Sequence, residues 1–173
     1  MGIAMRVAAL ALAAALGGVM GAHPAAAADK FLGKFAKWEA HQTGAGADTV
    51  CFIATLPAKT EGKVTKRGET TLMIAHFTKR KAWGQVQVKA GFALKKGSTV
   101  ELAIGDKRFK LTADGTTGFG EGAKENADIV AALKNGKTAT ATEIPATGPK
   151  IVDAYSLDGF GKALAAIDKA CRK

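Results

Sequence analysis

Apolar and polar residues alternate with a period of two in the middle of the chain, a pattern typical of β-strands that bury one face. Four such runs follow one another at residues 70–78, 83–90, 98–104 and 107–113. The connections between them are short. The last two runs, for example, are separated by only two residues, Gly105-Asp106. Because short connections favour hairpins, we expect these strands to form an antiparallel meander.

Two further strand-like runs precede the meander. In residues 34–42, a single strand would place Ala36, Trp38 and Ala40 on one side. Residues 49–57 are apolar on both faces, which favours a strand that is buried on both sides.

The pattern changes after residue 113. Residues 114–123 are rich in glycine and predict a surface loop. In residues 125–134 the apolar positions have helical spacing, with Ile129, Ala132 and Leu133 on the inner side. The sequence therefore predicts a short helix after the meander.

The last part of the chain predicts two extended segments, at residues 137–144 and 150–157, and then a helix at about residues 158–171. One apolar stripe runs along this helix, and its members are Phe160, Leu164, Ile167 and Cys171. The expected fold is mainly β and antiparallel, with a short helix and a C-terminal helix.

The first 28 residues differ from the rest of the chain, since 21 of them are apolar. A positive start with Arg6, an apolar run over residues 7–20 and the small residues Ala26-Ala27-Ala28 just before Asp29 are typical of a secretory signal peptide. We expect cleavage between Ala28 and Asp29, and a periplasmic, secreted or outer-surface location. Residues 29–173 then form a single domain with no transmembrane segment.

Residues 29–173 contain two cysteines, Cys51 and Cys171. An even number of cysteines in an exported chain predicts one disulfide bond. No metal site is expected, because there is no C-x-x-C pair and His41 and His76 lack the spacing of metal ligands.

The sequence shows no catalytic constellation. Neither Ser98 nor Ser156 lies in a G-x-S-x-G turn, and the strands that carry His41 and His76 imply no acidic neighbour. The run Gly136-Lys137-Thr138 lacks the earlier glycine of a phosphate-binding loop. We therefore expect a protein that is not an enzyme and has no cofactor; an unrecognised hydrolase is a remote alternative.

Positive charge is concentrated in one segment. Residues 58–112 contain 13 Lys or Arg and 4 Asp or Glu, a net charge of +9, whereas the rest of residues 29–173 is neutral. Ten of these basic residues lie in or near turns of the meander and form the expected anion-binding surface: Lys66, Arg67, Lys79, Arg80, Lys81, Lys95, Lys96, Lys107, Arg108 and Lys110. Because a meander sends alternate turns to opposite ends, we expect a basic face with basic rims.

A basic surface attracts anionic lipids, glycans or acidic envelope proteins through a salt-sensitive field. Nucleic acid is not expected, because the compartment is wrong and no motif of stacking aromatic residues accompanies the lysines. An equally good interpretation is that the charge only maintains solubility and protects strand edges. A further alternative is a structural or envelope-stress module that binds partners in an apolar groove around Trp83 and Phe119.

Several short motifs carry a family resemblance. They are Cys51 in an apolar strand, Arg67-Gly68, Gly91-Phe92 with Lys96-Gly97-Ser98, Phe109-Lys110-Leu111, residues 128–136, and residues 153–160 leading to Ala163-Leu164 and Cys171. With these motifs the chain resembles, over about residues 50–171, the invasion-associated locus B (IalB) family of proteins exported by alphaproteobacteria. The resemblance implies an antiparallel β-sandwich, immunoglobulin-like or related, in the periplasm or at the cell surface. It also implies a loose association with host-cell invasion in pathogenic members, and no established catalytic residues.

Overall fold

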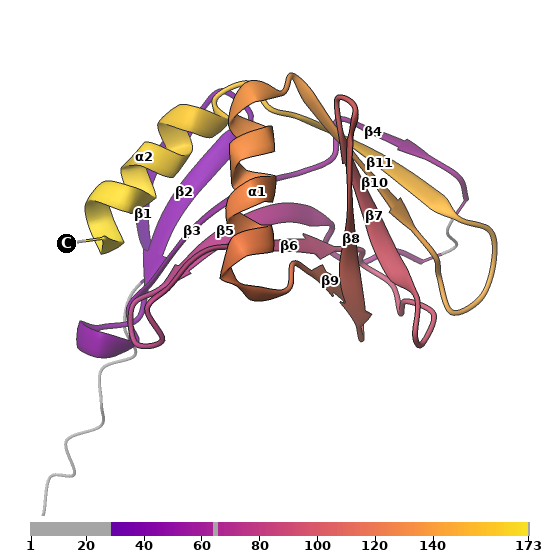
Figure 1. Cartoon of the computed structure of the whole chain (residues 1–173), viewed down its shortest axis with the longest axis horizontal. Helices are drawn as coiled ribbons and strands as arrows, with labels where there is room; N and C mark the ends of the chain where they lie inside the picture. The colour runs from indigo at the N-terminus through magenta and orange to yellow at the C-terminus, as the bar shows by residue number, and fades with distance from the viewer. Residues whose placement is uncertain (1–28, 64–65, 173) are drawn as a thin grey trace, which may run out of the picture.

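The computed structural model describes residues 29–63 and 66–172, and the predicted signal peptide at residues 1–28 lies outside this part (Figure 1). In the described residues, eleven strands form one antiparallel sheet. The strands are β1 (Lys30–Phe35), β2 (Trp38–Thr43), β3 (Val50–Thr55), β4 (Lys59–Glu61), β5 (Thr71–Phe77), β6 (Ala82–Lys89), β7 (Thr99–Ile104), β8 (Lys107–Asp114), β9 (Thr117–Phe119), β10 (Thr138–Glu143) and β11 (Ile151–Ser156). The helices are α1 (Gly122–Asn135) and α2 (Phe160–Cys171), with a short 3-10 turn η1 (Gly46–Asp48).

The strand order is β1-β2-β3-β5-β6-β9-β8-β7-β10-β11-β4. We call β1, β2, β3, β5 and β6 the first half-sheet, and the remaining six strands the second. The two halves turn toward each other, and their inner faces share one hydrophobic core (Figure 1). Trp38 of β2 donates a hydrogen bond from Nε1 to the Ser156 carbonyl of β11, 3.0 Å away, although the two strands are far apart in the strand order. The predicted antiparallel β-sandwich with helical additions is therefore confirmed.

The predicted inward positions form this core. In β6 and β7, Val86, Val88, Val100 and Leu102 are fully buried while their polar neighbours face outward. The inner side of α1 and the apolar stripe of α2 are also buried as predicted. The helix α2 lies over β1, β2 and β3, and α1 packs on β6 (Figure 1).

The predicted single strand at residues 34–42 is wrong. The chain turns at Ala36, whose φ of 52° no strand contains, so β1 and β2 form a hairpin. Alternation alone missed this turn because no glycine or asparagine marks it.

The simple meander is also wrong, because β6 does not pair with β7. The glycine-rich run contains β9, which lies between β6 and β8. Gly118 of β9 explains this close packing, since a Cβ at that position would lie 2.8 Å from Cγ2 of Val100.

Candidate functional site

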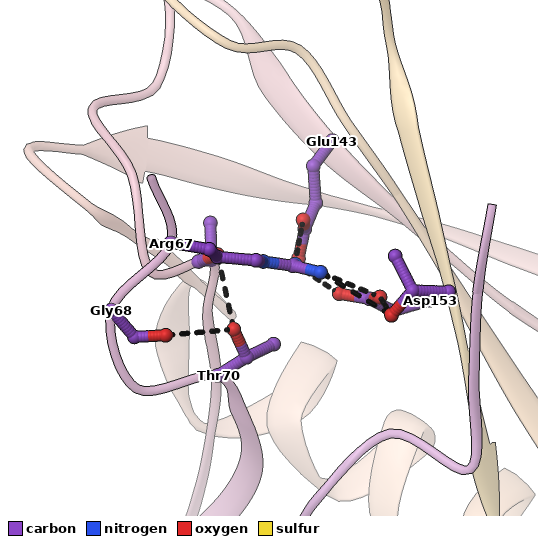
Figure 2. A network of polar contacts seen from close by, with 7 residues as sticks. Arg67, Gly68, Thr70, Glu143 and Asp153 are labelled. Carbon is purple, nitrogen blue, oxygen red and sulfur yellow. Dashed lines mark hydrogen bonds and ion pairs between the residues drawn. The ribbon is translucent and has the colours of Figure 1, made fainter. Parts of the chain in front are cut away.

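A network of charged side chains is buried inside the sandwich. Arg67 belongs to residues 66–70, the segment before β5 that we call the strap, and its side chain is only 17% exposed. One guanidinium nitrogen, Nη1, donates to Oδ1 of Asp153 at 3.0 Å, and Nη2 donates to Oε2 of Glu143 at 3.0 Å and to Oδ2 of Asp153 (Figure 2). Both acidic side chains are completely buried.

The register of the sheet explains why these carboxyl groups face inward. Asp153 pairs with Ala141 across β11 and β10, and Glu143 pairs with Ile151. Ala141 and Ile151 are fully buried, so the two acids occupy positions on the apolar inner face. Thr60 of β4 donates its hydroxyl to Oδ1 of Asp153 at 2.5 Å, which adds a further hydrogen bond to this carboxylate.

Burial controls the protonation of the network. Loss of hydration, aided by the nearby charge of Asp153, raises the pKa of Glu143 to about 8, so Glu143 is protonated at neutral pH. Burial by itself lowers the pKa of Arg67. The hydrogen bond to Asp153 and the charge of Asp153 outweigh this effect, so the pKa of Arg67 is raised overall. At neutral pH the network therefore holds one ion pair, between Arg67 and Asp153, and has no net charge.

Two polar atoms in this region have no hydrogen-bond partner among the described residues. They are Oε1 of Glu143 and the hydroxyl oxygen of Tyr155, and both are buried. Burial also raises the pKa of Tyr155, with the charge of Asp153 adding to the effect, so its phenol stays neutral. These two groups have no access to solvent. The hydrogen bonds of Arg67 to Glu143 and Asp153 hold the strap against β10 and β11.

The strap is also tied to the segment after β6. Nε of Arg67 donates to the Ala90 carbonyl at 2.8 Å, and the Gly68 amide donates to the Gly91 carbonyl at 2.7 Å. The guanidinium lies 5.2 Å from the ring centre of Phe92. Gly91 has a φ of 76°, and a Cβ there would lie 2.6 Å from the Gly68 carbonyl oxygen, so this contact requires glycine.

Arg67 therefore differs from the other nine residues of the expected anion-binding surface. Its charge is buried and matched by Asp153, because its side chain turns into the sandwich. The other nine are exposed. The pairing had no local sequence signal, since 86 positions separate Arg67 from Asp153.

The nine exposed residues lie in three places. The β5–β6 turn carries Lys79, Arg80 and Lys81, and the β7–β8 hairpin carries Lys107, Arg108 and Lys110 (Figure 1). The third group, Lys66, Lys95 and Lys96, lies at the other end of β6. The structure thus divides the expected surface into separate basic clusters.

Local contacts differ between these clusters. In the first, Lys79 pairs with Asp48 of η1 at 2.8 Å, and the Arg80 guanidinium lies 4.1 Å from the ring centre of Phe77. Within the part of the chain that the structure describes, neither Lys66 nor Lys95 forms a salt bridge. Lys66 instead borders a half-open hollow of about 390 Å³ between the strap and the loop that joins β10 to β11.

Comparison with known proteins agrees with this architecture. The family model of the invasion associated locus B (IalB) protein matches residues 38–168, which is most of the chain. The chain belongs to the IalB family. Its structure is similar to the crystal structure of invasion associated protein B from Bartonella henselae, with a TM-score of 0.52 and 18% identity over 79% of this chain and 97% of that chain. This likeness shows a shared fold, and no protein with curated annotation matches the chain.

The motifs behind the IalB resemblance have a structural explanation. Arg67-Gly68 forms the strap contact, and residues 153–155 supply Asp153 and Tyr155 to the inner face of β11. The most specific motif then continues into α2. In this IalB protein, two of the motifs thus supply Arg67 and Asp153 to the buried network.

Histidine geometry corrects one expectation. His76 has an acidic neighbour after all, since its Nε2 lies 3.0 Å from Oδ1 of Asp168 on α2. Its Nδ1 accepts a hydrogen bond from the Gly84 amide at 2.9 Å. Both ring nitrogens are thus engaged in the fold, which leaves neither free to activate a nucleophile.

The second histidine also has acidic neighbours. His41 lies 3.6 Å from Asp29 and 3.8 Å from Glu39, and its ring stacks on Phe52. No group of three or more metal-binding side chains occurs among the described residues. In the same residues, no helix combines the length and apolar character needed to cross a membrane.

The structure does not bring Trp83 and Phe119 together as one groove. Trp83 lies against His76 and Arg172 near the end of α2, whereas Phe119 pairs with Gln87 across β9 and β6. A larger hollow, of about 700 Å³, lies instead along β2 and β3. Its apolar residues include Phe52, Ala54, Leu56 and Pro57.

Proposed function

We propose that this IalB protein is exported to the envelope, is not an enzyme, and binds anionic lipids, glycans or acidic envelope proteins through its exposed basic clusters. Family membership supports an envelope role. Export is supported by the predicted signal peptide, and the bond between Cys51 and Cys171 suits an oxidising compartment.

The observation that carries the proposal is the exposure of the nine basic residues at turns. Charges on protruding turns reach an anionic surface without rearrangement of the sheet. Because these side chains are solvated, their attraction to a polyanion acts through the field of the cluster and falls with salt. The engagement of both His76 nitrogens supports a role without catalysis.

The experiment compares two triple variants with equal changes in charge. One reverses Lys79, Arg80 and Lys81 to Glu, and the other reverses the exposed helix residues Lys134, Lys162 and Lys169 to Glu. Binding to phosphatidylglycerol vesicles and to heparin resin is measured at low and high salt. The first variant should lose most of the binding and the second little of it. Binding that does not change with salt concentration, or an equal loss of binding in the two variants, would contradict the proposal.

A second candidate function is a structural or envelope-stress module that captures an apolar segment. The hollow along β2 and β3 favours it, since Leu56 at its rim is 67% exposed and Phe31 on the neighbouring strand is 56% exposed. In that case Leu56→Asp would abolish capture of an envelope partner, and reversal of the basic turns would leave it unchanged.

A further inference from the structure

We propose that the hollow between the strap and the β10–β11 loop binds a sugar that carries a phosphate group. This inference rests on the proposed function, because it names one anionic ligand and one place for it. The hollow has a volume of about 390 Å³ and is lined by residues that include Lys63, Lys66, Phe92, Pro145, Thr147 and Pro149.

The charge of the hollow is positive. Lys63 and Lys66 line it, and among the described residues no acidic side chain does so. In the buried network, the carboxylate of Asp153 is matched by Arg67.

The walls are held in place before any ligand arrives. On one side, the Arg67 and Gly68 contacts described above fix the strap against Gly91 and Phe92. On the other side, Leu94 forms a β-bridge with Pro145, and the Ala146 amide donates to the Ala93 carbonyl at 2.8 Å. Preformed walls lower the entropic cost of binding.

The lining matches a sugar phosphate. Phe92 and two prolines offer apolar surface to the C–H groups of a sugar ring, and the Thr147 hydroxyl can both donate and accept. Two ammonium groups suit a phosphate, whose oxygens accept charge-assisted hydrogen bonds. The volume is near the lower end of ligand pockets, roughly 300–1,000 Å³, so the site suits a single sugar unit.

The test is titration of the exported protein with glucose 1-phosphate, with glucose and inorganic phosphate as separate probes. Lys63→Gln combined with Lys66→Gln should lower the affinity for glucose 1-phosphate about tenfold or more, because two charged hydrogen-bond donors are lost. The control, Lys81→Gln combined with Lys107→Gln, removes the same charge elsewhere and should change affinity less than about twofold. Equal losses in the two variants would overturn the proposal.

A second variant tests the sugar itself. Phe92→Leu should lower the affinity for glucose 1-phosphate and leave the affinity for inorganic phosphate unchanged. If the protein does not prefer the sugar phosphate over inorganic phosphate, the proposed site is also wrong. Thermal unfolding of each variant shows whether it is folded. Vesicles with and without lipopolysaccharide then distinguish a glycolipid head group from a free sugar as the source.

The vesicle measurement also separates the two proposals. Salt-sensitive binding to phosphatidylglycerol vesicles without binding of glucose 1-phosphate would reject the hollow and keep the proposed function. Loss of both kinds of binding would reject both.

Discussion

Arg67 and Asp153 form a two-point ion pair inside the sandwich, although 86 positions separate them in the sequence. The pair connects the strap, which leads into the first half-sheet, to β11 in the second half-sheet. An arginine fork and a carboxylate match in geometry, so the pair fixes the orientation of the strap as well as its distance. The ion pair therefore links the two half-sheets on this side of the molecule.

Asp153→Asn should destabilise the protein strongly. The substitution leaves the Arg67 charge buried without a carboxylate, and loss of one partner from a buried pair costs about 3–5 kcal/mol. Glu143→Gln is the matched control, because Glu143 is already neutral at pH 7 and should lose less than about 1.5 kcal/mol. Urea unfolding at pH 7 measures both. Similar losses would contradict the assignment of the single negative charge to Asp153.

Stability should fall as the pH rises from about 5 toward 8. The pKa of Glu143 is about 8 in the folded protein and near the usual 4.5 when unfolded. Between these values the folded state holds a proton that the unfolded chain has released, so the free energy of unfolding decreases with pH, by at most about 1.4 kcal/mol per unit. Above about pH 8 this contribution levels off. The Glu143→Gln variant should lack the slope, and identical pH profiles for the two proteins would refute the prediction.

The sequence predicted the parts of the fold that repeat locally. Val86 and Val88, or Ile129 and Leu133, reveal their buried face by spacing alone, because each element needs one apolar side. The turn at Ala36 had no such signal, and β9 was hidden because glycines usually indicate a loop. Gly118 is a strand residue for a tertiary reason, namely its close contact with Val100.

The candidate site was predicted less well than the fold. Lys66 and Lys95 were expected at the surface, and exposure of lysine follows from its charge. Arg67 was expected there for the same reason, but its partner Asp153 belongs to a distant strand that no local pattern connects to it. The hollow depends on the same distant contacts, so it could not be predicted from the sequence.

The Cys51–Cys171 bond should protect both thiols from alkylation in the native exported protein. The cysteines are 120 positions apart, so the bond closes a long loop and should stabilise the fold by up to about 4–5 kcal/mol. Replacement of both by serine should lower the midpoint of urea unfolding accordingly and raise the slope, because the unfolded chain without the bond is more expanded. Mass spectrometry after treatment of the unreduced protein with iodoacetamide counts the free thiols. Two labelled cysteines would contradict the bond.

The exported protein should begin at Asp29. Ala26, Ala27 and Ala28 before this residue suit signal peptidase, which accepts small side chains at its cleavage site. Intact-mass measurement of protein recovered from the periplasm gives the N-terminus directly. Retention of residues 1–28 would contradict both cleavage and the proposed route of export.

Gly91→Ala should detach the strap from the segment after β6. Both Gly91 and Gly97 have positive φ, 76° and 73°, so alanine is strained at either position by about 1–2 kcal/mol. Only at position 91 would the new Cβ also meet a backbone oxygen, that of Gly68 at 2.6 Å, whereas nothing lies within 4 Å at position 97. Gly91→Ala should therefore cost at least about 2 kcal/mol more than Gly97→Ala in urea unfolding. Amide exchange offers a local readout, because the Gly68 N–H loses its acceptor in the first variant only. Equal stability of the two variants, with the Gly68 amide still protected, would show that the strap does not depend on this contact.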